Sequence, residues 1–184
     1  MLISHNREKL INAIIYFCKE TAVCNKLKLY KLLYHLDFRH YAQTGRSVTG
    51  LEYFAWPNGP VPTKLEKEIK APEEDMREKV EFYIPSLPEL GQAVEITPKA
   101  EFDNSVFTKR ELALLKEVAD EFSLSYANEM IQSTHLPGNP WDRVFNQEGR
   151  KQKKIPFEYA LSEDDAEEVK EAAIEHEEML ANYS

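Results

Sequence analysis

A long helix-forming segment that is apolar over most of its circumference limits the possible folds more than any other part of the chain. It begins after Asn25, a favourable N-cap, and ends at Gly45, which can stop a helix in the left-handed conformation. Its apolar band is made by Leu29, Leu32, Leu33, Leu36 and Tyr41, and is widened by Tyr30, Tyr34 and Phe38. A helix with so wide an apolar surface packs on several sides. The sequence therefore predicts a central helix over 25–44.

One carboxylate, Asp37, lies inside this apolar band. Burying a carboxylate is costly unless it is paired or hydrogen-bonded. Two interpretations follow from its position. Asp37 either caps a neighbouring loop, or it lies at the edge of a contact surface.

The segment 50–61 reads Gly-Leu-Glu-Tyr-Phe-Ala-Trp-Pro-Asn-Gly-Pro-Val. Pro57 and Pro60 fix their own φ and bias the residues before them towards extended shapes. Gly59 adopts positive φ at no steric cost, and Asn58 tolerates it better than most residues. The pattern predicts an aromatic strand over 51–56 that ends in a stiff turn. That turn is either a rigid connector or a recognition loop.

The remaining periodicities indicate an α+β fold that is predominantly α-helical, a helical domain with a small antiparallel β-sheet. Further helices are predicted over 6–21, 62–70, 108–122, from 123 or 125 to 133, and 162–181. Thr108 and Glu111 form a capping-box pattern at the start of one of them. Short strands are predicted over 80–84 and 94–97, and we expect the strand over 94–97 to pair with 51–56.

Charge is distributed unevenly along the 184 residues, whose net charge is −9. The excess is basic over 1–70 and most strongly acidic over 158–184. We expect a domain over 1–150, followed over 151–184 by a basic linker and an acidic C-terminal helix. That helix either supplies partner specificity or is a solubilising terminal helix that docks weakly on the basic first third.

No motif for catalysis, metal binding or a cofactor is found. Cys18 and Cys24 have neither redox nor zinc spacing, so we expect buried free thiols. His35 and His40 lie about 140° apart on a helix and cannot share a metal as an i, i+4 pair would. We therefore expect a protein that is not an enzyme and that holds no cofactor. No apolar stretch is long enough to span a membrane, and the N-terminus lacks the plan of a signal peptide, so a cytoplasmic location is expected.

Basic and aromatic residues alternate along the predicted central helix. A patch of Lys26, Lys28, Lys31, Arg39 and Arg46 with interleaved tyrosines would suit single-stranded nucleic acid. The other interpretation is a solvated helix edge. Because the whole chain is acidic, we do not expect the protein alone to bind nucleic acid.

Several segments together resemble the Panacea domain of SocA-like and phage-associated GepA-like antitoxins. They are Lys-Leu-Leu-Tyr-His-Leu-Asp-Phe over 31–38, Thr-Gly-Arg over 44–46 and Ala-Trp-Pro-Asn-Gly-Pro-Val over 55–61, followed by Ser-Thr-His over 133–135 and by Pro140-Trp141. The resemblance covers about residues 5 to 145. It implies a non-catalytic module of bacterial and phage toxin–antitoxin pairs, a kind of module that is paired with many unrelated toxins.

The resemblance implies that the protein binds and neutralises a cognate toxin protein. The matched positions that would contact the toxin are Asp37, Trp56, Asn58, Gly59, Pro60, His135 and Trp141. A core role for each tryptophan is equally consistent with the pattern. The alternative function is that of an adaptor that delivers a bound protein to a host protease, or of a phage-encoded modulator that binds a host protein.

Overall fold

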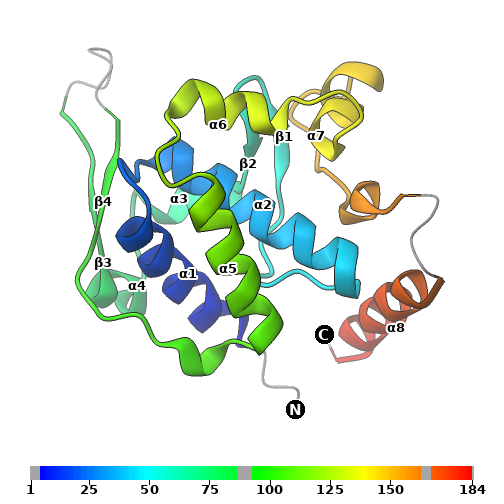
Figure 1. Cartoon of the computed structure of the whole chain (residues 1–184), viewed down its shortest axis with the longest axis horizontal. Helices are drawn as coiled ribbons and strands as arrows, with labels where there is room; N and C mark the ends of the chain where they lie inside the picture. Colours follow the sequence, from blue (N-terminus) through cyan, green and yellow to red (C-terminus); the bar gives the residue numbers. More distant parts are fainter. Residues whose placement is uncertain (1–4, 87–92, 163–166, 184) are drawn as a thin grey trace.

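The computed structural model describes residues 5–86, 93–162 and 167–183. Figure 1 shows the arrangement of its helices and strands. The helices are α1 (Asn6–Glu20), α2 (Lys26–Thr44), α3 (Thr63–Glu68), α4 (Glu74–Lys79), α5 (Lys109–Glu121), α6 (Ala127–Thr134), α7 (Pro140–Asp142) and α8 (Glu167–Tyr183). Shorter helical turns are η2 (Asn104–Val106), the π-helical η3 (Arg143–Gln147) and η4 (Phe157–Ala160). Among the described residues, no helix combines the length and the apolar character needed to cross a lipid bilayer.

Helix α2 is the centre of the molecule, as predicted. The Asn25 side chain accepts a hydrogen bond from the Lys28 backbone N–H, and Gly45 ends the helix with a φ of 70°. Helices α1, α5 and α6 and the strand β2 (Gly59–Val61) all pack against it (Figure 1). Burial on all sides explains why its apolar residues exceed a single stripe. The predominantly helical α+β fold is confirmed.

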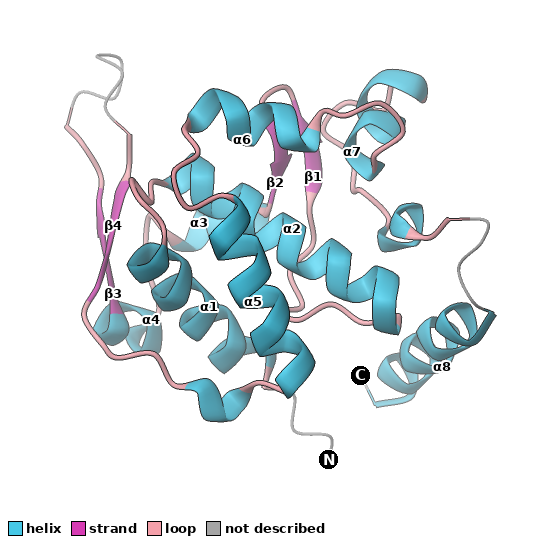
Figure 2. Ribbon diagram, in the orientation of Figure 1, coloured by secondary structure: helices cyan, strands magenta, loops and turns pink. Residues whose placement is uncertain are grey.

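The strands form two separate antiparallel hairpins in the described part of the chain (Figure 2). Strand β1 (Phe54–Trp56) pairs with β2, while β3 (Val80–Tyr83) pairs with β4 (Glu95–Pro98). The predicted pairing of 51–56 with 94–97 is therefore wrong. The Pro57-Asn58 turn brings β2 directly back onto β1, and a hairpin with so short a loop has a small closure entropy.

The basic run over 150–154 lies along the outer edge of β1 in the β1–β2 hairpin. Gln152 N–H donates to the Ala55 carbonyl at 2.7 Å, Ala55 N–H donates to the Lys153 carbonyl at 2.9 Å, and Ile155 N–H donates to the Tyr53 carbonyl at 2.8 Å. Ile155 is buried in the core. Part of the predicted linker thus borders β1 as an extended segment, whereas the division of the chain at residue 150 remains a prediction.

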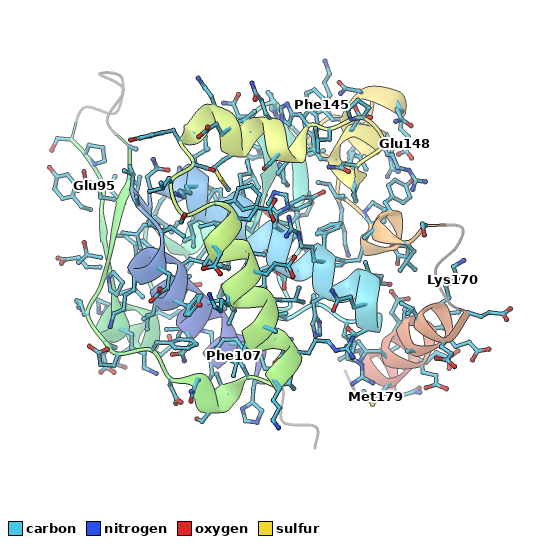
Figure 3. All side chains as sticks on the ribbon, in the orientation of Figure 1. Glu95, Phe107, Phe145, Glu148, Lys170 and Met179 are labelled. Carbon is cyan, nitrogen blue, oxygen red and sulfur yellow. The ribbon has the colours of Figure 1, made fainter. Side chains whose placement is uncertain are left out.

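Helix α8 packs against the C-terminal end of α2. A Cβ atom built on Gly45 would lie 2.7 Å from the Ala173 backbone nitrogen and 2.9 Å from the Val169 carbonyl oxygen. Ala173 is buried, whereas the glutamates of α8 are exposed. Figure 3 shows this outward orientation for Lys170, on the same helix. Residues 163–166 of the predicted acidic first turn lie outside the described residues.

Candidate functional site

Asp37 organises the loop that leads into β1. Its carboxylate accepts hydrogen bonds from Val48 N–H at 2.8 Å, from Thr49 N–H at 2.9 Å, from the Thr49 hydroxyl at 2.5 Å and from the Tyr53 hydroxyl at 2.6 Å. The residue is fully buried. Burial raises the pKa of Asp37, and these hydrogen bonds oppose that shift. The geometry is that of an aspartate that caps a loop, the first of the two sequence interpretations.

The turn over 56–60, which we call the recognition turn, rests on a buried amine. Lys31 donates from Nζ to the Pro60 carbonyl at 2.9 Å. Gly59 has a φ of 100°, and a Cβ atom there would lie 2.7 Å from Lys31 Cε and 2.9 Å from Thr134 Oγ1. Burial lowers the pKa of Lys31 to about 7. Gly59 is thus required both for its backbone conformation and for the close approach of Lys31 and Thr134.

A column of stacked side chains supports the other side of the turn. Trp141 donates from its indole nitrogen to the Trp56 carbonyl at 2.9 Å. The His135 ring stacks on Trp141 with centroids 3.6 Å apart and planes 2° apart, and the Phe145 ring lies 4.6 Å away on Trp141 as well. The Lys151 ammonium lies 5.3 Å from the Phe145 centroid. Figure 3 shows the position of Phe145 near α7.

The link between α6 and α7 is fixed by Asp142, which the sequence analysis did not single out. Its carboxylate accepts from the Asn146 side chain at 2.7 Å, from Gly138 N–H at 2.9 Å and from the Gln147 side chain at 2.8 Å. These donors, Asn146 first, lower the pKa of Asp142. An aspartate directly after Pro140-Trp141, at a helix start, is the sequence signal that could have found it.

The structure gathers six of the seven predicted contact residues at the recognition turn and the stacked column. Trp56 is 38% exposed, Asn58 is exposed and His135 is half-buried. The others, Gly59, Pro60, Trp141 and the more distant Asp37, are buried. The part of the site that reaches solvent is therefore Trp56, Asn58 and the exposed portion of His135, which we call the recognition face. The buried residues hold it in place.

The basic patch considered for α2 is not present. Lys28 and Lys31 are each 1% exposed, and the three interleaved tyrosines are buried as well. Arg39 pairs with Glu117 and Glu121 of α5. The patch fails because α2 is central, so its basic side chains are turned inward or neutralised by neighbouring helices.

Among the described residues, one acidic cluster has the spacing to hold a metal ion, namely Glu68, Glu73 and Asp75. Arg7 already contacts this cluster. Its guanidinium donates to both oxygens of Glu68 and to both oxygens of Asp75. The cluster is thus an ion-pair network that joins α1 to α3 and α4.

The comparison with protein families shows the family of the chain. The family model described as antitoxin SocA-like, Panacea domain, matches residues 29–142. The chain belongs to this SocA-like antitoxin family. No curated protein and no solved structure matches the chain. The Panacea match runs from the first turns of α2 to α7, so it includes the recognition turn, His135 and Trp141.

Proposed function

We propose that this protein is an antitoxin that neutralises a cognate protein toxin by direct binding. The observation that carries the proposal is the match to the SocA-like antitoxin family over the segment that contains the recognition turn, His135 and Trp141. The toxin partner is the component that an antitoxin family implies. The proposal adds direct contact between that toxin and the recognition face.

The chemistry of the recognition face supports this role. Trp56 presents an exposed aromatic surface, and tryptophan is enriched among residues that dominate binding energies. Its backbone is held by Trp141, and the turn is held by Lys31. Such preorganisation reduces the entropy lost on binding. A rigid face with one large aromatic residue fits an apolar pocket on a partner protein.

In this proposal the protein acts by binding its toxin and not by catalytic turnover. It acts in the cytoplasm. Two histidines in the described part of the chain make contacts within the fold. His35 contacts the Ser133 hydroxyl at 2.9 Å, and His135 stacks on Trp141. These contacts supply orientation within the fold. The antitoxin would then act stoichiometrically, by covering or distorting the toxin's active site.

The test is titration of antitoxin against toxin, with the neighbouring reading frame expressed as the candidate toxin. Rescue should rise in proportion to antitoxin dose, and the two proteins should co-purify. Trp56→Ala should weaken binding by about tenfold or more. Tyr83→Ala is the matched control, because Tyr83 is a 61% exposed aromatic residue on the separate β3–β4 hairpin. Equal binding by both variants would exclude the recognition face.

The rescue experiment also distinguishes direct neutralisation from the alternative function, when it is done in cells with and without the host protease. An adaptor would lower the amount of toxin in cells that contain the host protease, and would fail to protect cells that lack it. Direct neutralisation predicts protection in both strains. Complete rescue by a trace of the protein over a large excess of toxin would contradict binding as the mode of action.

A further inference from the structure

The basic run over 150–154 lies beside the recognition turn. Its cationic side chains are all exposed, namely Arg150, Lys151, Lys153 and Lys154. The run is placed by hydrogen bonds to β1, because Gln152 N–H donates to the Ala55 carbonyl and Ala55 N–H donates to the Lys153 carbonyl. Ala55 directly precedes Trp56, the aromatic residue of the recognition face. Positive charge is therefore held at the edge of this face.

The stacked column leads to the same run from another direction. Trp141 donates to the Trp56 carbonyl, and the Phe145 ring stacks on Trp141. The Lys151 ammonium lies 5.3 Å from the Phe145 centroid. The cation of Lys151 thus contacts the column that supports the backbone of Trp56. The recognition face and the basic run form one continuous surface.

The backbone of the run is ordered by further hydrogen bonds. Arg150 N–H donates to the Val144 carbonyl at 2.8 Å, and Lys153 N–H donates to the Arg150 carbonyl at 3.2 Å. Gln152, between two lysines, has a φ of 60°, which is uncommon for a residue other than glycine. A backbone that is already fixed loses less entropy when its side chains bind a partner. The run therefore presents its lysines from a preorganised turn.

Two lysines of the run keep their charge available. Arg150 and Lys154 already pair with glutamates of the fold. Among the described residues, no ion pair involves Lys151 or Lys153, and none joins the run to the exposed glutamates of α8. These two cations can therefore meet a negative charge on another molecule without breaking an ion pair of this chain.

We propose that the toxin surface that meets the recognition face is acidic, with carboxylates that pair with Lys151 and Lys153. The inference rests on the proposed antitoxin function and names the chemistry of the partner. Trp56 would enter an apolar pocket of the toxin, and the carboxylates would lie at the edge of that pocket. Because the whole chain carries a net charge of −9, an acidic toxin surface is attracted locally, at this run. Such complementarity speeds association and fixes orientation.

The test measures association of the full-length protein with the purified product of the neighbouring reading frame, at low and at high salt. Lys151→Gln/Lys153→Gln should associate about threefold or more slowly at low salt, and the difference should shrink at high salt. Lys151→Arg/Lys153→Arg keeps both charges and should associate like the wild type. This variant separates the effect of charge from the contact with Phe145.

The matched control is Lys99→Gln/Lys109→Gln, which changes the net charge by the same amount. Both lysines are exposed, Lys99 directly after β4 and Lys109 at the start of α5. This variant should associate at the wild-type rate. An equal loss in the control would overturn the proposal, because the effect would then come from net charge.

The remaining outcomes distinguish this inference from the antitoxin function. Wild-type association by Lys151→Gln/Lys153→Gln at low salt would overturn the inference and leave the antitoxin function standing. A wild-type protein that does not bind the toxin would overturn both. A fluorescent single-stranded oligonucleotide tests the other class of partner. If the glutamine variant lost oligonucleotide binding while its toxin association was unchanged, the run would serve nucleic acid and the proposal would be wrong.

Discussion

Single buried polar side chains position the loops of this domain. Asp37 gathers the backbone of Val48 and Thr49, and Lys31 holds the Pro60 carbonyl. Neither makes an ion pair among the described contacts. Each therefore depends on hydrogen bonds to offset the loss of hydration. Replacing either residue should lower the stability of the fold, and any change at the surface should follow from that loss.

The buried amine of Lys31 predicts a dependence of stability on pH. Its pKa is about 7 in the folded state, against about 10.4 in an unfolded chain. Between these values the unfolded state binds the extra proton, so the free energy of unfolding rises with pH. The expected slope is about 1.4 kcal/mol per pH unit. Urea unfolding of wild type and Lys31→Met should therefore diverge from pH 7.5 to 9.5, and parallel curves would contradict the shift.

The crowding at Gly59 can be separated from its backbone strain. Gly59→Ala meets Lys31 and Thr134 within 3.0 Å, whereas Gly138, with a similar φ of 83°, has no atom within 4 Å of a built Cβ. Gly138→Ala should lose about 1 kcal/mol of stability from conformation alone. We expect Gly59→Ala to lose about 1–3 kcal/mol more, because Lys31 or the turn must shift. Equal losses of stability in thermal unfolding of the two variants would show that the turn accommodates the added methyl group without a free-energy cost.

At the scale of elements, the sequence predicted the features that local signals determine, such as the ends of helices. Asn25 and Gly45 mark the ends of α2, and the Thr108–Glu111 capping box forms as expected at the start of α5. Strand pairing was missed because alternation identifies a strand but not its partner. The edge position of Gln152 was missed for the same reason: a short basic run gives no sign of the hairpin that it borders.

The candidate site was predictable to a similar extent. The sequence indicated Trp56, His135 and Trp141, but the stack that joins the last two depends on how the link between α6 and α7 folds. The role of Lys31 was hidden because a lysine on a helix is usually solvated. Its burial follows from the central position of α2, which is a property of the whole packing.

The docking of α8 on α2 should depend on the missing side chain at Gly45. Gly45→Ala places a methyl group against the Ala173 backbone, whereas Gly149, with a φ of 64°, has open space around it. Hydrogen exchange over Val169–Met179 should become faster in Gly45→Ala and remain unchanged in Gly149→Ala. If both variants keep the wild-type rate, the close contact does not hold the helix.

At the scale of the whole molecule, removal of the C-terminal helix tests folding and partner binding separately. Of the α8 residues whose burial the structure describes, Ala173 is the buried one, so deletion of 160–184 should leave the core folded, with a loss on the order of 1 kcal/mol. If the acidic face supplies specificity, the truncated protein should bind toxin more weakly at low salt, and the intact complex should weaken as salt rises. Calorimetry of both proteins measures this. Wild-type affinity after truncation would leave α8 as a solubilising helix.

The pairing of β1 with 152–155 also sets an order of events during synthesis. The ribosome makes Ala55 nearly a hundred residues before Gln152, which donates to its carbonyl. At a translation rate of about 5–20 residues per second, the outer edge of β1 stays unpaired for roughly 5 to 20 seconds until the segment 152–155 is made. During that interval a nascent chain carries an open strand edge that can pair with other chains. The recognition turn is therefore completed late in translation, when most of the chain has been made.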